Sequence, residues 1–292
     1  MEAKTCPVCG RQFFKSKYLS RNNWDTKKYC SRKCYIIAMP KIENKGRFSK
    51  GNIPSNRSVW LFRELTPELS YIIGVYLGDG CVNVGQVLYR NKKDYCWKYE
   101  FSLGAIDKDF VDYTAKCLKK ILGKDVMVHF QKAKNKKSQD IWRCSVANKD
   151  LCEWLKKITR NKQKIPYIIW NANNELKKYF LMGIMDSEGY VEKDKRPNHN
   201  YVSVGFSMQG LLPDQIVRLF QQIGVRHGKR GVDNRTFNGK KRSSSLIRYR
   251  LNTMDFIRSG LRFNIARKQK RLDDYASINN LNDYTPINSL VS

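Results

Sequence analysis

The sequence predicts an α+β protein made of two similar halves, each ordered α-β-β-α-β-β-α, with a small metal-binding module in front of them. Three observations support this prediction. An apolar stretch that ends in a carboxylate and a glycine occurs twice, at 72–80 and at 181–189. A second helical pattern also recurs, because LKKILG at 118–123 parallels LFQQIG at 219–224. Four of the nine cysteines fall in the first 34 residues, as two close pairs.

The N-terminal cysteines predict a zinc-binding module over residues 1–38. Their pattern is C-x2-C followed, after 20 residues, by C-x3-C, and two close thiolate pairs suit a closed tetrahedral Zn²⁺ site. A segment this short cannot bury a core, so metal ligation would supply its folding free energy. Two disulfides or free thiols are the alternatives. The expected zinc ligands are Cys6, Cys9, Cys30 and Cys34.

A basic linker is expected over residues 39–63. Residues 1–63 contain 15 lysines and arginines against three acids, and the stretch 40–58 has no sustained hydrophobic periodicity. Such a segment is either a solvated tether or an extended arm that lies along a phosphate backbone or enters the minor groove. In the second case Arg47 and Lys50 are the expected contacts.

The first half, residues 64–165, begins at a clear helix start. Thr66 supplies a capping hydroxyl, and Pro67 suits the first helical position. Gly74 and Gly78 lie four residues apart on one face of this helix. Each glycine costs a helix about 1 kcal/mol relative to alanine. Close approach of a second helix is a reason for both of them.

The remaining elements of the first half are two pairs of strands and two helices. The strands are expected at 81–90, 95–103, 126–131 and 140–146, and the helices at 107–122 and 148–157. In the second strand, alternate residues from Trp97 to Leu103 are apolar and are predicted to face the core. The opposite, polar face can read base edges in a major groove, although an ordinary solvated face is the alternative. The expected DNA contacts are Lys98, Glu100, Ser102, Lys132, Lys134 and Arg143.

The second half, residues 166–276, repeats this plan and precedes a polar tail at 277–292. Gly183 and Ser187 stand where the first half has Gly74 and Gly78. Strands are expected at 190–194, 201–207, 225–232 and 245–251, with a helix at 213–223. Arginines at alternate positions of the last strand suit guanine edges or phosphates. The expected DNA contacts here are Ser203, Arg248 and Arg250.

Each repeated stretch ends in an acid, Asp79 in the first and Glu188 in the second. If the two helices pack through their small residues, these carboxylates lie side by side. Two such acids repel each other unless cations lie between them, and Mg²⁺ prefers oxygen ligands of this kind. Two ions held there can activate a water and stabilise a leaving oxygen in phosphodiester hydrolysis. One stretch alone would indicate an ordinary buried helix, but two matched copies favour a site.

Both stretches resemble the signature helix of the LAGLIDADG homing endonucleases. Asp79 and Glu188 match the family's metal-binding acids, with Gly78 and Ser187 beside them as further ligands. Leu77 departs from the family pattern, which has an aspartate at that position. The resemblance implies a saddle of antiparallel sheets over a DNA duplex. It also implies a monomer that uses Mg²⁺, with Ca²⁺ or Mn²⁺ as substitutes, and leaves 3′ overhangs in support of intron homing.

A Lys-Gln-Lys tripeptide follows the last helix of each half, at 162–164 and at 268–270. In the family a basic residue in this region lies beside the metal site and stabilises transition-state charge. The resemblance therefore assigns this role to Lys162 and Lys268. Lys164 and Lys270 are close alternatives, and generic phosphate contact is another.

The family also places a polar residue near the attacking water, at the end of the second strand of each half. Asp107 and Gln209 fall at that point of the sequence. The resemblance therefore adds both to the expected catalytic residues.

The composition favours a polyanionic partner. The net charge is +30, with 56 lysines and arginines against 26 acids. There is no run of about 20 apolar residues and no apolar signal segment, so we expect no membrane partner. A reducing compartment is expected, either the cytoplasm of a bacterial, archaeal or phage-infected host or an organelle.

We expect a freestanding, intron-encoded enzyme that binds a long asymmetric double-stranded DNA site, with its own intron RNA as a second candidate partner. One alternative is an intron RNA maturase or a non-cleaving DNA-binding regulator on the same fold. Another is a structural nucleic-acid-binding protein whose zinc module makes the contacts.

Overall fold

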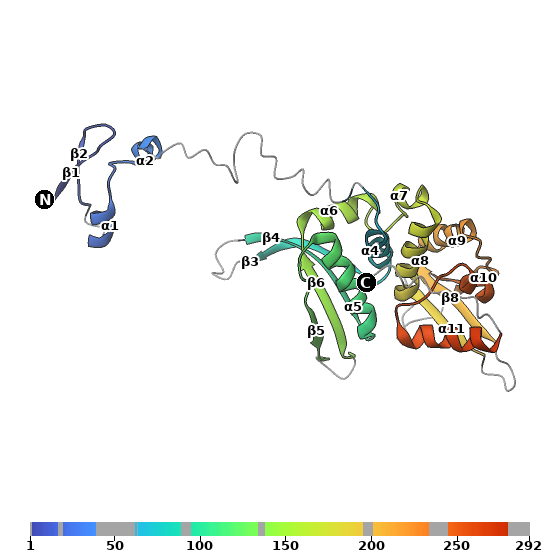
Figure 1. Cartoon of the computed structure of the whole chain (residues 1–292). Helices are drawn as coiled ribbons and strands as arrows, with labels where there is room; N and C mark the ends of the chain where they lie inside the picture. Colours follow the sequence, from blue (N-terminus) through green and yellow to red (C-terminus); the bar gives the residue numbers. More distant parts are fainter. Residues whose placement is uncertain are drawn as a thin grey trace. The chain divides into compact units, whose positions relative to one another are not determined.

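The computed structural model describes residues 2–16, 20–38, 62, 64–88, 95–133, 138–194, 201–233 and 245–279. The chain divides into two compact units, Met1–Asn56 and Arg57–Ser292 (Figure 1). The expected contacts Arg47, Lys50 and Lys134 lie outside the described residues. Among the described helices, none has the length and apolar character needed to cross a membrane.

The first unit is a small α/β module around one tryptophan. It consists of β1 (Ala3–Thr5), β2 (Gln12–Phe14), α1 (Arg21–Thr26) and α2 (Arg32–Ala38), with β1 and β2 antiparallel. Ser20 caps α1 by accepting from the backbone N–H of Asn23. Trp24 of α1 is buried, and its ring meets Phe13 edge-on at 5.6 Å between centroids. Among the described residues of this unit, only Cys6, Trp24 and Cys34 are buried, so the module has a very small core and depends on its cysteine cluster for stability.

The first half of the second unit has the predicted order of elements. They are α4 (Pro67–Leu77), β3 (Cys81–Leu88), β4 (Tyr95–Ala105), α5 (Lys108–Leu122), β5 (Val128–Gln131), β6 (Ile141–Ala147) and α6 (Lys149–Ile158). The strands form an antiparallel sheet in the order β3-β4-β6-β5. Thr66 caps α4 by accepting from the N–H of Leu69, as its sequence position predicted.

The second half repeats the order and adds two helices. Its elements are α7 (Tyr167–Trp170), α8 (Asn174–Glu188), β7 (Gly189–Lys193), β8 (Val202–Gln209), α9 (Leu212–Gln222), β9 (Gly231–Asp233), β10 (Leu246–Leu251), α10 (Thr253–Arg258) and α11 (Ala266–Ile278). The sheet order β7-β8-β10-β9 matches that of the first half. The predicted strand at 225–232 is mostly not a strand. Val225 enters the core instead, and His227 makes only an isolated bridge to Leu251.

α4 and α8 pack against each other through their small residues. A Cβ built on Gly74 would lie 2.2 Å from the carbonyl oxygen of Phe180 and 3.2 Å from the Cα of Gly183. One turn later, a Cβ on Gly78 would lie 2.4 Å from the Cβ of Ser187. Helix backbones approach this closely only where Cβ atoms are missing. The predicted reason for both glycines of α4 is confirmed.

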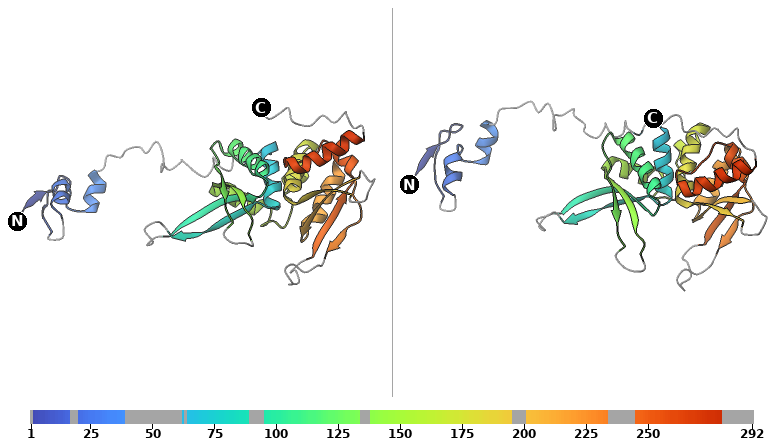
Figure 2. Two further views of the ribbon diagram at one scale, coloured as in Figure 1. Left: turned by 90° about the horizontal axis from the view of Figure 1, so that it is seen from below. Right: turned by 60° about the horizontal axis from the view of Figure 1, so that its bottom comes forward.

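The two sheets extend from the same side of the helix pair (Figure 2). α5 packs on one face of the first sheet, and α11 packs on one face of the second. Phe101 and Leu103 of β4 are buried as predicted, but Trp97 is 60% exposed. In Figure 1 the ends of β3 and β4 that are farthest from the helix pair lie away from α5 and α6. Ser102 and Ser203, expected on exposed polar faces, are buried instead.

Candidate active site

Asp79 and Glu188 lie at the same end of the helix pair. α4 ends at Leu77, and the N–H of Gly80 turns back to the carbonyl of Val75 at 2.8 Å, which places Asp79 in the exposed turn. Glu188 is the last residue of α8. A Cβ on Gly78 would lie 3.3 Å from the Cγ of Glu188. The close packing of the helices therefore brings the two acids to one place.

Both acids have raised pKa values, because burial outweighs the effect of the nearby lysines. Removal from water and, to a smaller extent, the negative charge of Asp79 raise the pKa of Glu188 to about 7, against the effect of Lys162 and Lys268. Removal from water also raises the pKa of Asp79, although Lys268 and Lys162 oppose the shift. A metal ion requires deprotonated carboxylates, and its charge would favour that form of both acids.

The raised pKa of Glu188 gives a stability prediction. Because the folded chain holds this proton more tightly than the unfolded chain, Glu188 lowers stability as the pH rises from about 4.5 to about 7. Glu188→Gln removes the effect. We expect the variant to be more stable than the parent by about 1–2 kcal/mol above pH 7, after a discount for solvent screening, and the difference to vanish near pH 4.

Urea unfolding without divalent metal, measured between pH 4 and pH 8, tests this prediction. Glu153→Gln, which removes an exposed carboxylate of α6, is the matched control. A pH-independent difference between Glu188→Gln and the parent chain would show that the charge of Glu188 is not disfavoured in the fold.

Lys162 and Lys268 each reach the end of a signature helix. The Nζ of Lys162 donates to the carbonyl of Gly78 at 2.7 Å. The Nζ of Lys268 donates to the carbonyl of Asp186 at 2.9 Å and to that of Met185 at 3.3 Å. Burial lowers the pKa of both lysines. The structure thus places the first lysine of each Lys-Gln-Lys tripeptide in the site.

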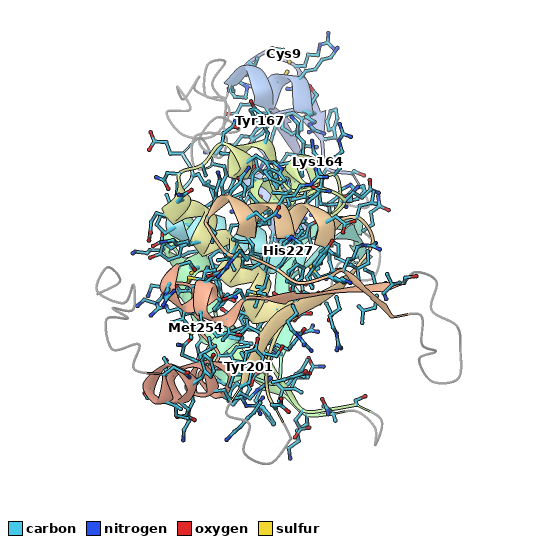
Figure 3. All side chains as sticks on the ribbon, turned by 90° about the vertical axis from the view of Figure 1, so that its right-hand side faces the viewer. Cys9, Lys164, Tyr167, Tyr201, His227 and Met254 are labelled. Carbon is cyan, nitrogen blue, oxygen red and sulfur yellow. The ribbon has the colours of Figure 1, made fainter. Side chains whose placement is uncertain are left out.

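The second lysine of each tripeptide lies elsewhere. Lys164, labelled in Figure 3, is partly buried and donates its backbone N–H to the carbonyl of Thr159. Lys270 is exposed on α11. Neither side chain has a described contact with the helix ends that carry Asp79 and Glu188, so the first lysines remain the better candidates.

A left-handed turn positions Lys162. Arg160, Asn161 and Lys162 have φ angles of 48°, 52° and 66°, and each non-glycine residue in this region costs of order 1 kcal/mol. The hydroxyl of Thr159 accepts from the N–H of Lys162 at 3.2 Å and itself donates to the carbonyl of Leu155 at 2.7 Å. No sequence signal predicts this turn, because it contains no glycine.

Asp186 joins the two halves through hydrogen bonds. Its buried carboxylate accepts from the hydroxyl of Tyr71 at 2.8 Å, and from the N–H and side-chain amide of Asn264 at 2.9 and 2.8 Å. Burial raises the pKa of Asp186 to about 6, although these donors oppose the shift. In the first half Leu77 stands at this position. Asp186 is therefore a structural acid that joins α8 to α4 and to the segment before α11.

Gln209 lies at the site, whereas Asp107 does not occupy the equivalent position. A cavity of about 390 Å³ is lined by Gln209, Glu188 and Lys162 together with Leu77, Gly78, Ser207, Met208, Leu212 and Leu246. In the first sheet Val82 pairs with Phe101, and in the second sheet the equivalent Val191 pairs with Val204. The residue five positions after Phe101 is Ile106, and the residue five positions after Val204 is Gln209. Ile106, and not Asp107, is therefore the first-half residue equivalent to Gln209.

The residues present fit a hard divalent cation. Two carboxylates supply the oxygen donors that Mg²⁺, Mn²⁺ and Ca²⁺ prefer, and the pKa of Glu188 is raised by burial and by the negative charge of Asp79. The expected Gly78 carbonyl already accepts from Lys162, and the Ser187 hydroxyl donates to the Gly183 carbonyl at 3.0 Å. Asp79 and Glu188 are thus the principal donors available to an ion.

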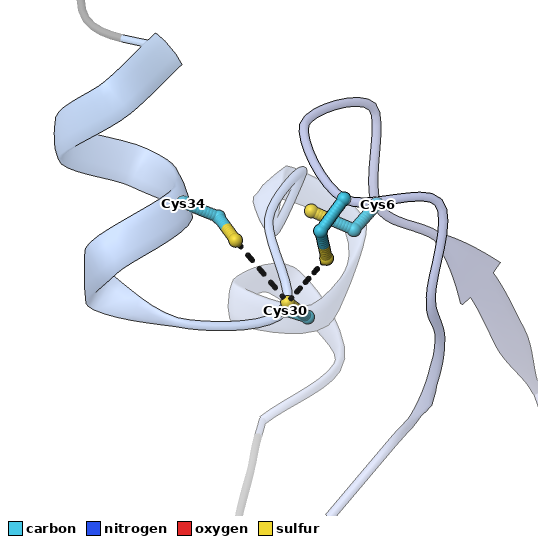
Figure 4. Close-up of side chains that lie close together, drawn as sticks. Cys6, Cys30 and Cys34 are labelled. Atoms are coloured by element: carbon cyan, nitrogen blue, oxygen red, sulfur yellow. Dashed lines mark hydrogen bonds between the residues drawn. The ribbon is translucent and has the colours of Figure 1, made fainter.

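The four N-terminal cysteines meet as predicted (Figure 4). Their sulfur atoms all lie within 4.8 Å of one another, with 3.5 Å between Cys9 and Cys30 and 3.6 Å between Cys30 and Cys34. Zn–S bonds of about 2.3 Å in a tetrahedron separate the sulfurs by roughly 3.8 Å. None of the described cysteines is in a disulfide. The cluster therefore fits a structural Zn²⁺ ion.

Loss of one thiol should unfold this module. We expect Cys6→Ser to reduce bound zinc from about one ion per chain to nearly none, because the remaining thiols cannot close the tetrahedron. Elemental analysis of the purified chain measures the metal. Cys81→Ser, an exposed cysteine of the second unit, is the control. Equal zinc in the parent and Cys6→Ser chains would contradict the site.

Comparison with known proteins finds relatives over part of the chain. No family model matches. An uncharacterized protein of Methanocaldococcus jannaschii is 33% identical over 150 residues, which are 51% of this chain and 49% of that protein. A second uncharacterized protein of the same organism is 30% identical over 162 residues, 55% of this chain and 56% of that protein. The chain thus spans about half the length of these relatives.

Solved structures with a similar arrangement include homing endonucleases. The structure of I-DmoI in complex with DNA and Mn has a TM-score of 0.44 at 14% identity, and the match covers 67% of this chain and 97% of that one. The LAGLIDADG homing endonuclease I-GzeII in complex with its DNA target has a TM-score of 0.41 at 14% identity, covering 75% of this chain and 91% of that one.

Proposed function

We propose that this chain is a metal-dependent endonuclease of the LAGLIDADG type, which hydrolyses one phosphodiester bond in each strand of double-stranded DNA. The observation that carries the proposal is the meeting of Asp79 and Glu188 at one end of two close-packed helices, with a lysine on each helix end. Structural acids are normally paired or capped, as Asp186 is. Asp79 and Glu188 lie instead in a partly open site and keep raised pKa values there, which is typical of catalytic groups.

The residues around the two acids have distinct roles. Divalent ions held by Asp79 and Glu188 would polarise the scissile phosphate and lower the pKa of a bound water. The ammonium groups of Lys162 and Lys268 stabilise the negative charge that grows on the phosphate oxygens. Gln209, beside Glu188 in the cavity, orients the attacking water through its amide.

The DNA would lie across the polar faces of the two sheets, in successive major grooves. Arg143 and Arg248 occupy equivalent strand positions, opposite Gly104 and Ser207, and Arg250 has no arginine counterpart in the first half. Since the two faces differ in sequence, one chain acting as a monomer would read a long asymmetric site.

The polar side chains on these faces are held in defined places. Lys98 and Glu100 form an ion pair at 2.8 Å. The guanidinium of Arg248 lies over the Tyr190 ring at 5.3 Å, and its Nε donates to the hydroxyl of Ser207. Lys132 is exposed at the end of β5. Ser102 and Ser203 would need local opening to reach DNA.

Intron homing through 3′ overhangs is the biological role this reaction would serve.

Cleavage of a randomised DNA library tests the function without knowledge of the target. The chain is incubated with the library and Mg²⁺, and the cut ends are sequenced. The proposal predicts enrichment of one long asymmetric motif, cut in both strands with 3′ overhangs, and no enrichment when Mg²⁺ is chelated. Uncut DNA under both conditions, despite folded protein, would exclude the proposed function.

A further inference from the structure

Two cavities are each lined by residues from both halves of the second unit. One is lined by Ile106 and Asp107 of the first half and by Ala266 and Arg267 of the second, and Lys268 is the next residue along the chain. The cavity that holds Glu188 is also lined by Lys162 and Gln209. The chain therefore contains two composite half-sites, one with Lys268 next to the cavity of Ile106 and the other with Glu188, Lys162 and Gln209.

The two lysines are held by different means. Lys162 lies in a turn that is closed by neighbours in its own half. Lys268 lies in the first turn of α11, and the start of α11 is held by the first half. The guanidinium of Arg267 donates from Nε and Nη2 to the two carboxylate oxygens of Asp107, at 2.7 and 2.8 Å. The N–H of Ala266 donates to the carboxylate of Asp109 at 2.6 Å.

We propose that the Asp107–Arg267 pair is a positioning device for Lys268, so that it controls cleavage of one DNA strand and has little effect on the other. This inference rests on the proposed function. Asp107 touches no reacting group in this assignment. It acts through Arg267, the residue next to Lys268, and a displacement of about 1 Å in a catalytic group is enough to cost on the order of 10²-fold in rate.

The rest of α11 does not depend on this pair. Arg271 donates to the carbonyl of Val191 at 2.7 Å, and Leu272 and Tyr275 are buried against the second half. Asn264, before the helix, is held by Asp186. Loss of the Asp107–Arg267 pair should thus leave α11 folded and loosen only its first turn, where Lys268 lies.

The half-site with Lys268 is also the one with fewer polar groups. Ile106 stands where the other half-site has Gln209, so this strand position supplies no amide to orient water there. Catalysis in this half-site then relies more heavily on the lysine and on its placement. The chemical difference between the half-sites strengthens the expectation of strand-selective effects.

The test follows each DNA strand separately. A target duplex selected by the parent chain is labelled differently on its two strands, and single-turnover cleavage is measured with Arg267→Ala, Asp107→Ala and the double variant. We expect one strand to be cut at least about 10-fold more slowly and the other within about 2-fold of the parent rate, so that nicked DNA accumulates. The double variant should be no slower than the single ones, because both remove one contact.

The chain offers a closely matched control in Arg226→Ala. Arg226 also makes a bidentate pair, with Asp255 at 2.6 and 3.0 Å, but away from the two acids. It should leave both strand rates unchanged. Arg267→Lys keeps the positive charge but cannot make the bidentate contact with Asp107. It should slow cleavage of the same strand by an intermediate amount.

Binding and melting measurements separate positioning from damage to the fold. DNA affinity and melting temperature of Arg267→Lys should match those of the parent chain. Equal slowing of both strands, or no slowing of either, by the Arg267 and Asp107 variants would overturn the inference. Absence of cleavage by the parent chain itself would instead refute the proposed function, so the two failures are distinguishable.

Discussion

Replacement of Asp79 by asparagine, or of Glu188 by glutamine, is expected to abolish double-strand cleavage while DNA affinity stays within a few-fold of the parent value. Each substitution removes a charged metal ligand but keeps the shape of the side chain. The ions act on the reacting phosphate, whereas the sheets bind the duplex. We therefore expect the cleavage rate, and not the DNA affinity, to fall by on the order of 10³-fold or more. Cleavage of end-labelled duplex under single-turnover conditions, with affinity measured in Ca²⁺, separates the two quantities.

Glu153→Gln controls for the general loss of a carboxylate, because Glu153 is exposed on α6 and forms an ion pair with Lys149 away from the site. Full cleavage activity in either the Asp79 or the Glu188 variant would refute the assignment of that acid. Loss of DNA affinity in parallel with activity would indicate that the acids maintain the fold or the binding surface instead.

Replacement of Gly74 by alanine is expected to be among the most destabilising single-methyl changes in the chain. The new Cβ would lie 2.2 Å from the carbonyl oxygen of Phe180, and the same change at Gly183 would place it 2.3 Å from the carbonyl oxygen of Tyr71. These contacts are with backbone atoms, so the helices must separate. We expect a loss of about 3 kcal/mol or more in the free energy of unfolding.

The sign of this effect makes the test decisive. In a helix with free space, glycine to alanine stabilises by about 1 kcal/mol, so an unchanged or increased stability would contradict close packing of α4 on α8. Gly85→Ala is the control, since nothing lies within 4 Å of the position that its Cβ would take. Urea unfolding of the three chains supplies the comparison, and separated helices should also reduce cleavage by displacing Asp79 from Glu188.

The helix pair could be predicted from sequence because its information is local and is present twice. Gly74 and Gly78 matter only if a partner helix approaches, and Gly183 with Ser187 identifies that partner by the same spacing. Each tripeptide could be placed near its acid for a similar reason, whereas the choice between its two lysines needed the contacts of Lys162 and Lys268. The distance of the tripeptide along the chain from the acid is nearly the same in both halves.

Other parts of the site depend on contacts between residues far apart in sequence. α11 begins without a side-chain cap of its own, at Ile265, and its first N–H is satisfied by Asp109 from the other half. No start signal is therefore present in the sequence near 266. The partner of Arg267 could not be chosen in advance either, because arginine and lysine are so abundant in this chain.

The predicted sheet faces show a third limit. Period-two alternation assigns residues to faces but does not say how far along a strand the covering helices extend. Trp97 belongs to the apolar side of β4 and yet is exposed, while Ser203 belongs to the polar side of β8 and yet is buried. Both outcomes depend on the neighbours of the strand and not on its own sequence.

The most direct measurement of the central claim is cleavage of DNA that carries the uninterrupted insertion locus, with Mg²⁺ supplied or chelated. If Asp79 and Glu188 bind the metal of one catalytic site, the chain should make two cuts, one in each strand. The cuts should be staggered to leave 3′ overhangs, and they should not occur without Mg²⁺. Binding without any cut in the presence of Mg²⁺, or selective binding of the intron RNA with no activity on DNA, would contradict the account and favour a non-cleaving role.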